Sequence, residues 1–237
     1  MCGFGYPARN EEQYQKSQDK LIKKISYDEL KQIRDKPFNE ITFVEGYTSC
    51  CVGIVDIVNS TRITSKLVND KVCKYYSIFL NTMADIARDF GAKVVKNIGD
   101  SLLYYFPETS YTDNKTAFKN VLECSMTMIN HHTALNQKMY NEGLPDVNYR
   151  TSLDYGNVLI ASSFNSSNED IFGSTVNLCA KINSIAKPNG IVIGGDLHQN
   201  VKNFEEYDFN LITTYSSGLK LEYPVYSIIR SKTKKRF

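Results

Sequence analysis

The stretch KVVKNIGDSLLYYF, residues 93–106, places two apolar runs on either side of a Gly99-Asp100 pair. Apolar runs around such a pair are typical of a β-hairpin, so one strand is expected on each side of the turn. Lys96 and Asp100 interrupt the apolar pattern. Because an isolated charge is costly to bury, both side chains are expected to have partners elsewhere in the chain.

The segments around this hairpin predict alternating strands and helices. The dense apolar run SCCVGIVDIV at 49–58 is typical of a strand buried on both faces. Residues 60–91 open on Ser-Thr and end at a glycine, which predicts one long helix. A second long helix is predicted over 114–142, before a Gly and a Pro.

The C-terminal third predicts a second hairpin, a helix and more strands. Residues 148–162, NYRTSLDYGNVLIAS, are interpreted as a hairpin turning at 155–157. A polar loop follows, and then a helix over 173–186 that Pro-Asn-Gly at 188–190 ends. Further strands are predicted at 190–194, 207–214 and 224–229.

The order strand, helix, strand, strand, helix, strand predicts an α+β fold. It matches a ferredoxin-like split βαβ core (βαββαβ) with extra C-terminal strands. Residues 1–44 are predicted to be a polar, partly helical N-terminal extension, 45–231 the main domain, and 232–237 a basic tail.

The amino-acid composition limits which binding partners and which cellular location are expected. With 42% apolar residues, 23% charged residues and a net charge of +2, the chain has the composition of a soluble globular protein. This charge does not favour nucleic acid or membrane as the main partner. No apolar run reaches the roughly 18 residues of a transmembrane segment, and no secretory signal is evident. The six cysteines lack metal-site or disulfide spacing, so a cytoplasmic location with reduced thiols is expected.

Two aspartates are the first candidates for chemistry. Asp56 interrupts the predicted buried strand, where a carboxylate needs a cation or hydrogen-bond donors. A strand-end aspartate bonded to the backbone and a solvated turn residue at Asp100 are the alternatives. In a split βαβ sheet the first strand lies beside the hairpin, so the two carboxylates are expected to meet at one edge. Paired hard oxygens suit Mg²⁺ or Mn²⁺, with substrate phosphates completing the coordination.

The segment IVNST, residues 57–61, passes from this strand into the next helix. Its backbone N–H groups point toward the helix start, so Asn59, Ser60 and Thr61 are candidates for phosphate binding. The chain has neither a P-loop nor a GxGxxG motif, which argues against a P-loop NTPase and a Rossmann dehydrogenase.

Four ordered blocks resemble the catalytic domain of class III nucleotidyl cyclases, the adenylate and guanylate cyclases. The resemblance runs over about 48–229. The blocks are GIVDIVNST, VVKNIGDSLLYYF, EDIFGSTVNLCAKI and PNGIVIGGDL. The resemblance implies attack of a ribose 3′-hydroxyl on the α-phosphate of a nucleoside triphosphate, with release of pyrophosphate. It also implies two Mg²⁺ or Mn²⁺ ions per site.

The resemblance implies a role for individual residues. Asp56 and Asp100 would bind the metals, together with the carbonyl of Ile57. Lys96 and Asp170 would recognise adenine, which makes ATP the expected substrate and cyclic AMP the product. Read locally, Lys96 could instead be a strand-edge lysine and Asp170 a helix cap.

Three further residues are matched to ribose and phosphate. Asn177 would orient the ribose and Lys220 would bind a phosphate. Lys181 stands where the family has an arginine that stabilises the transferring phosphoryl group. Its i, i+4 spacing from Asn177 keeps both on one helix face, but a lysine lacks the bidentate fork of arginine. A solvated pair one turn apart is the alternative.

The resemblance also implies assembly. In this family the metal-binding aspartates come from one catalytic domain and the base, ribose and phosphate residues from its partner, so a head-to-tail homodimer is expected. Alternative functions are a cyclase acting on GTP or a pyrimidine triphosphate (UTP or CTP), and a catalytically weak nucleotide-binding module. A diguanylate cyclase is disfavoured because the GGDEF signature is absent.

Overall fold

The structure is a computed structural model that describes residues 41–43, 46–163, 169–216 and 222–231. All of them belong to the unit Ile41–Phe237. Residues 41–43 of the predicted extension form strand β1 (Ile41–Phe43). The rest of that extension and the predicted basic tail lie outside the described residues.

The described strands form a sheet in the order β3-β4-β2-β5-β7-β9-β8, and β1 and β6 pair with β5 off this path. The order β5-β2-β4-β3, with all neighbours antiparallel, is the split βαβ arrangement. The predicted α+β class and core topology are therefore confirmed. The strands are β2 (Thr48–Ile57), β3 (Lys93–Ile98), β4 (Ser101–Phe106), β5 (Tyr149–Ser163), β6 (Glu169–Phe172), β7 (Ile191–Gly194), β8 (Tyr207–Ser216) and β9 (Glu222–Arg230).

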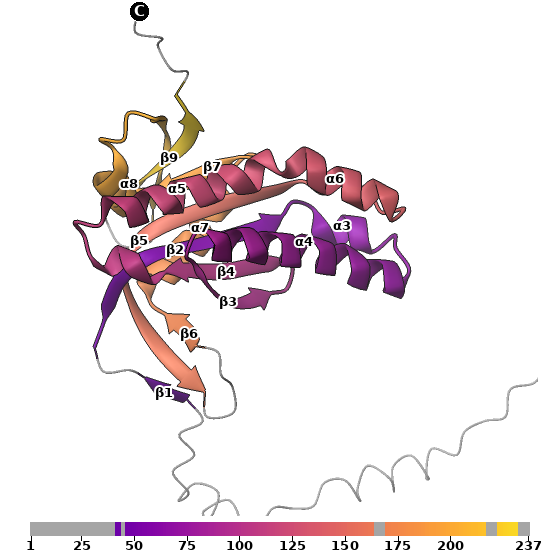
Figure 1. The fold of residues 1–237 in the computed structure, drawn as a ribbon, viewed down its shortest axis with the longest axis horizontal. Helices are drawn as coiled ribbons and strands as arrows, with labels where there is room; N and C mark the ends of the chain where they lie inside the picture. Colours follow the sequence, from indigo (N-terminus) through magenta and orange to yellow (C-terminus); the bar gives the residue numbers. More distant parts are fainter. Residues whose placement is uncertain (1–40, 44–45, 164–168, 217–221, 232–237) are drawn as a thin grey trace, which may run out of the picture. The chain divides into compact units, whose positions relative to one another are not determined.

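Helices cover both faces of this sheet. On one face lie α4, α5 and α6, while α7 packs against β5 and β2 on the other (Figure 1). The described helices are α3 (Ser60–Thr64), α4 (Asn69–Asp89), α5 (Lys115–Asn130), α6 (His132–Asn141), α7 (Ser174–Asn183) and α8 (Gly195–Val201), with a 3₁₀ turn, η1 (Pro107–Ser110).

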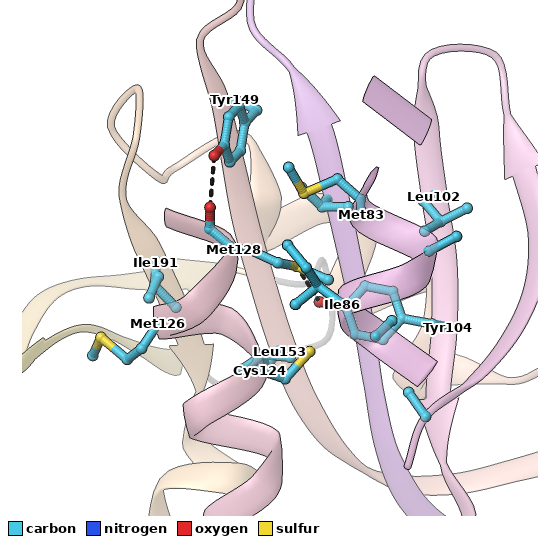
Figure 2. Close-up of a cluster of buried hydrophobic side chains, with 14 of the residues drawn as sticks. Met83, Ile86, Leu102, Tyr104, Cys124, Met126, Met128, Tyr149, Leu153 and Ile191 are labelled. Carbon is cyan, nitrogen blue, oxygen red and sulfur yellow. Dashed lines mark hydrogen bonds between the residues drawn. The ribbon is translucent and has the colours of Figure 1, made fainter. Parts of the chain in front are cut away.

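The main core lies between the sheet and α4 and α5. Figure 2 shows Met83 and Ile86 of α4 packed toward Tyr104 and Leu153 of the sheet. The buried hydroxyl of Tyr149 donates a hydrogen bond to the Met128 carbonyl of α5 at 2.6 Å. Each large apolar side chain buried here contributes about 1.5–3 kcal/mol, so this layer supplies most of the packing energy.

Alternation along β2 decides which face each residue serves. Cys51 and Val55 belong to the core under α4 and α5, whereas Val52 and Ile54 belong to a smaller cluster on the α7 side. Because side chains alternate along a strand, Asp56 falls on the α7 side. The prediction of a strand buried on both faces is confirmed.

The two long helices are each broken. The predicted helix over 60–91 divides into α3 and α4, because Val68 is extended (φ −72°, ψ 153°) and starts a new helix. The Thr64 hydroxyl bonds back to the Ser60 carbonyl, a local contact that competes with helix continuation. The predicted helix over 114–142 is divided at His131, which caps the end of α5 and the start of α6.

The hairpin predicted at 148–162 is wrong, since these residues form one long strand, β5. The supposed turn at Gly156 pairs in register with Cys50 of β2. A Cβ atom at Gly156 would lie 2.6 Å from Thr175 Oγ1, so the glycine permits close packing of α7. Figure 1 shows the far end of β5 extending past the sheet to carry β1 and β6.

Candidate active site

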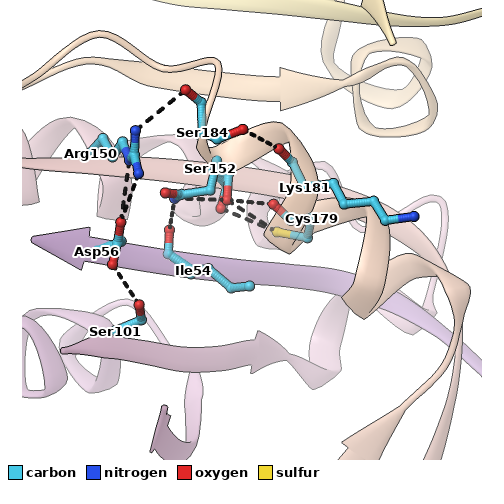
Figure 3. A network of polar contacts seen from close by, with 9 residues as sticks. Ile54, Asp56, Ser101, Arg150, Ser152, Cys179, Lys181 and Ser184 are labelled. Carbon is cyan, nitrogen blue, oxygen red and sulfur yellow. Dashed lines mark hydrogen bonds and ion pairs between the residues drawn. The ribbon is translucent and has the colours of Figure 1, made fainter. Parts of the chain in front are cut away.

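Asp56 lies near the end of β2 in a network of charged and polar groups. Ser101 Oγ donates to Asp56 Oδ1 at 2.6 Å. Arg150 Nη2 and Nε donate to Asp56 Oδ2 at 3.1 Å and 3.3 Å. Figure 3 shows Asp56 between these two partners, which come from β4 and β5. The carboxylate has the cation and donors that its burial requires.

Asp56 near the end of β2 and Asp100 in the β3–β4 turn lie at the same end of these neighbouring strands. Ser101 pairs with Asp56 across the β2–β4 ladder, and Asp100 directly precedes Ser101 in the turn. Among the described residues no group of three or more His, Cys, Asp or Glu side chains is placed to hold a metal. A divalent ion here would therefore combine these carboxylate oxygens with backbone, water or substrate oxygens.

Arg150 is a site residue that the sequence analysis missed. It lies directly opposite Asp56 across the β2–β5 ladder, and its Nη1 also donates to the Ser184 carbonyl just after α7 at 3.3 Å (Figure 3). The pairing register of β2 and β5, which places Arg150 opposite Asp56, is what identifies it. The register was hidden because residues 148–162 read as a hairpin rather than as one strand.

Lys96 and Asp170, matched to recognition of the base, meet as an ion pair within one chain. Asp170 lies on β6, so its readings as part of a loop or as a helix cap are wrong. Its Oδ1 also accepts the Ile171 N–H at 2.8 Å, and Lys96 Nζ lies 5.8 Å from the centroid of the Phe172 ring. Both side chains of the pair remain partly exposed, at 45% and 32%, and accessible to a ligand.

A β-bulge directs Lys96 toward β6. Lys93 lies opposite Tyr105 of β4, and a register shift at Val95 then places Lys96 opposite Leu103. Tyr105 and Leu103 point to the same face of the sheet, so the two lysines share that face although they are three positions apart. Regular alternation would have turned Lys96 to the opposite face.

Asn177 and Lys181 lie one turn apart on α7, and both are exposed. In Figure 3 the Lys181 side chain extends away from Asp56 and Arg150. The helix itself is fixed to the sheet by buried Asn183, whose amide donates to the Ile54 carbonyl at 3.2 Å. Within one chain, the predicted phosphate lysine and the predicted metal aspartate therefore point to different places.

The remaining predicted residues lie around the end of β2. Ile57 is the last residue of that strand and its side chain is buried. Asn59 has a left-handed backbone (φ 60°, ψ 29°) and begins α3, where Ser60 is buried and Thr61 exposed. Lys220 lies outside the described residues.

A second buried carboxylate, Asp154, was not identified from the sequence. It is 1% exposed and accepts the Tyr223 hydroxyl at 2.8 Å and the Tyr155 N–H at 2.9 Å. Burial, opposed by these hydrogen bonds, raises the pKa of Asp154 to about 7. It joins β5 to β9, so it serves the fold rather than the Asp56 network.

This carboxylate predicts a pH dependence of stability. Because the folded protein keeps a proton that the unfolded chain releases at about pH 4, stability should fall as the pH rises from about 4 to 7. In Asp154→Asn this decrease should be absent. From pH 5 to pH 8 the free energy of unfolding of the variant should therefore rise by about 2 kcal/mol relative to that of wild type. Urea unfolding at both pH values measures it, and an unchanged difference between the two proteins would contradict it.

Comparison with known proteins places this geometry in a family. Residues 43–223 match the model of the adenylate and guanylate cyclase catalytic domain, and the chain belongs to this family. An adenylate cyclase of Streptomyces coelicolor is 28% identical over 142 residues, covering 60% of this chain and 31% of that protein. A cytidylate cyclase of Staphylococcus aureus is 24% identical over 158 residues, covering 65% of this chain and 37% of that protein.

The fold agrees with this assignment. The crystal structure of the adenylyl cyclase CyaB from P. aeruginosa matches with a TM-score of 0.70 and 19% identity, over 79% of this chain and 97% of that one. The chain spans about a third of the curated relatives' length. Those relatives are named for different nucleobases, so family membership does not select one base. No helix among the described residues is long and apolar enough to cross a membrane.

Proposed function

We propose that the chain converts ATP to 3′,5′-cyclic AMP and pyrophosphate, at a site shared by two copies of the chain. The observation that carries this proposal is that Asp56 pairs across the β2–β4 ladder with Ser101, the residue after Asp100, in a member of the cyclase family. The Lys96–Asp170 ion pair supports adenine as the base.

The donor set at the sheet edge fits divalent cations. Asp56, Asp100 and the Ile57 carbonyl are hard oxygen donors that would hold Mg²⁺ or Mn²⁺, two ions per site. Bound ions lower the pKa of the ribose 3′-hydroxyl and offset phosphate charge. Arg150, which neutralises Asp56 in this structure, would then be free to bind triphosphate oxygens with its bidentate fork.

Lys96 and Asp170 fit the edge of adenine chemically. A lysine donates to the ring nitrogen acceptor, and a carboxylate accepts from the neighbouring amino group. Cytosine presents the same adjacent acceptor and donor, and the similarity to a cytidylate cyclase makes CTP the second candidate. GTP and UTP are the remaining alternatives.

Asn177 and Lys181 would act on the ribose and the phosphates. Asn177 orients the sugar so that its 3′-oxygen faces the α-phosphorus, and the Lys181 ammonium offsets charge on the transferring phosphoryl group. The backbone at Asn59, Ser60 and Thr61, and Lys220, would hold the other phosphates. One O–P bond forms and one breaks, and the hydroxyl proton leaves to water or to a substrate phosphate.

The directions of the side chains support a shared site. Lys181 extends away from Asp56 within one chain (Figure 3), so a second, head-to-tail copy would supply the α7 residues to each pair of aspartates. Two equivalent sites would lie at a two-fold interface.

Product identification tests the proposal. The full chain is incubated with each of the four nucleoside triphosphates and Mg²⁺ or Mn²⁺, and products are identified by mass. Cyclic AMP is expected as the fastest-formed product. A different cyclic nucleotide would reassign the base, and binding without turnover would identify a weak nucleotide-binding module instead.

A further inference from the structure

A second charged contact joins β3 to β6 beside the Lys96–Asp170 pair. Lys93 Nζ lies 3.0 Å from Glu169 Oε2, and Glu169 directly precedes Asp170 in β6. Because neighbouring residues of a strand point to opposite sides, Glu169 and Asp170 leave β6 in different directions. Both carboxylates nevertheless pair with lysines on one face of β3, so two ion pairs connect β6 to β3.

A buried tyrosine fixes the position of Glu169. The Tyr105 hydroxyl donates to Glu169 Oε2 at 2.6 Å, and Tyr105 itself is 2% exposed within the cluster on the α7 side of the sheet. A rigid buried side chain thus reaches out of the core to one oxygen of the carboxylate. Lys93 Nζ lies 6.0 Å from the centroid of the same tyrosine ring, so all three groups form one unit.

The Tyr105–Glu169 hydrogen bond keeps its donor and its acceptor near neutral pH. The hydrogen bond from Tyr105, followed by that from Lys93, lowers the pKa of Glu169. Burial and the contact with Glu169 raise the pKa of the Tyr105 hydroxyl, which therefore remains a donor. Near neutral pH the tyrosine therefore stays protonated and the glutamate ionised.

Apart from these contacts, β6 is a short strand with one buried core residue, Ile171. Its four residues pair with β5 beyond the end of the main sheet (Figure 1). Lys96, by contrast, belongs to β3 in the main sheet, where the bulge at Val95 sets its direction. The distance between Asp170 and Lys96 therefore depends on how firmly β6 is held to β3.

We infer that Glu169, held by Tyr105 and Lys93, is a positioning residue that sets the spacing of Lys96 and Asp170 and thereby the nucleobase selectivity of the site. This inference rests on the proposed function. It assigns to the Tyr105–Glu169–Lys93 unit a role in recognition of the base, although none of the three touches the base.

Two conservative variants test it. Tyr105→Phe removes the hydroxyl and keeps the ring in the core, and Glu169→Gln removes the charge and keeps an acceptor. The ratio of kcat/KM for the preferred triphosphate to that for the least used should fall about three- to tenfold, mainly through a higher KM. The kcat at saturating nucleotide should change less than about twofold.

A matched control lies elsewhere in the chain. Tyr207 donates to Glu123, which also pairs with Arg230, so it repeats the same chemistry away from β6. Tyr207→Phe and Glu123→Gln should leave the selectivity ratio unchanged. A fall of the same size in these controls would show that the effect is a general loss of stability, and would overturn the inference.

A double substitution separates positioning from any other role. If Tyr105 acts through Lys96, then Tyr105→Phe should have no further effect on selectivity in a Lys96→Met background. Wild-type turnover with unchanged selectivity in Tyr105→Phe and Glu169→Gln would overturn this inference alone. Wild-type protein that forms no cyclic product would overturn the proposed function, and this inference with it.

Discussion

Asp56→Ala and Asp100→Ala are each expected to reduce cyclic nucleotide formation to background, in Mg²⁺ and in Mn²⁺. Each substitution removes one of the two carboxylates at the β2–β4 edge. The remaining carboxylate cannot hold two divalent ions, so neither activation of the hydroxyl nor neutralisation of phosphate charge is supplied. Initial rates measured by mass detection of the product, over a range of metal concentrations, check this.

The controls for this prediction follow from the contacts of Asp56. Its removal leaves Arg150, 25% exposed, without that partner, which should cost about 1–3 kcal/mol of stability. Thermal unfolding must therefore accompany every rate. Asp85→Ala is the matched control, since Asp85 pairs with Arg88 on the surface of α4. Near wild-type activity in folded Asp56→Ala protein would contradict the proposal that Asp56 and Asp100 bind two catalytic metal ions.

Lys181→Ala is expected to lower the rate on the order of 10²-fold, whereas Lys181→Arg should preserve or raise it. The charge at this position would face the transferring phosphoryl group, and an arginine adds a bidentate fork that a lysine lacks. The kcat at saturating nucleotide is the measurement. A lower kcat with an unchanged KM would place the interaction in the transition state.

Lys187→Ala serves as the control for this substitution. Lys187 is an exposed lysine just beyond the end of α7, so its removal changes the net charge equally without changing the proposed site. If Lys181→Ala is as active as Lys187→Ala and wild type, Lys181 is a solvated helix residue with no part in phosphoryl transfer.

The elements whose structure depends on residues near in sequence were predicted correctly. The 93–106 hairpin formed as expected because Gly99 adopts a left-handed backbone (φ 64°) in the turn between two apolar strands. The strand around Asp56 followed from its dense apolar run. Since these two elements are neighbours in the sheet, the position of Asp56 one ladder pair away from the turn that holds Asp100 was also predictable.

Contacts distant in sequence determined what was missed. Gly156 reads as a turn residue, yet it is glycine because Thr175 packs against it. That error concealed Arg150 opposite Asp56. Asp170 lies in a strand because β6 pairs with β5. A segment of four residues is too short for its sequence pattern to predict such a pairing. The bulge at Val95 likewise depends on the register with β4.

Subunit mixing tests the shared metal-dependent site most directly. Asp56→Ala and Asn177→Ala proteins, each inactive alone, should form heterodimers with one intact site and one doubly damaged site. With free exchange about half of the chains are in heterodimers, so activity should return to roughly a quarter of the wild-type value. Recovery to that level is the predicted result. No recovery, despite demonstrated exchange of subunits, would contradict the shared site and the residue roles that depend on it.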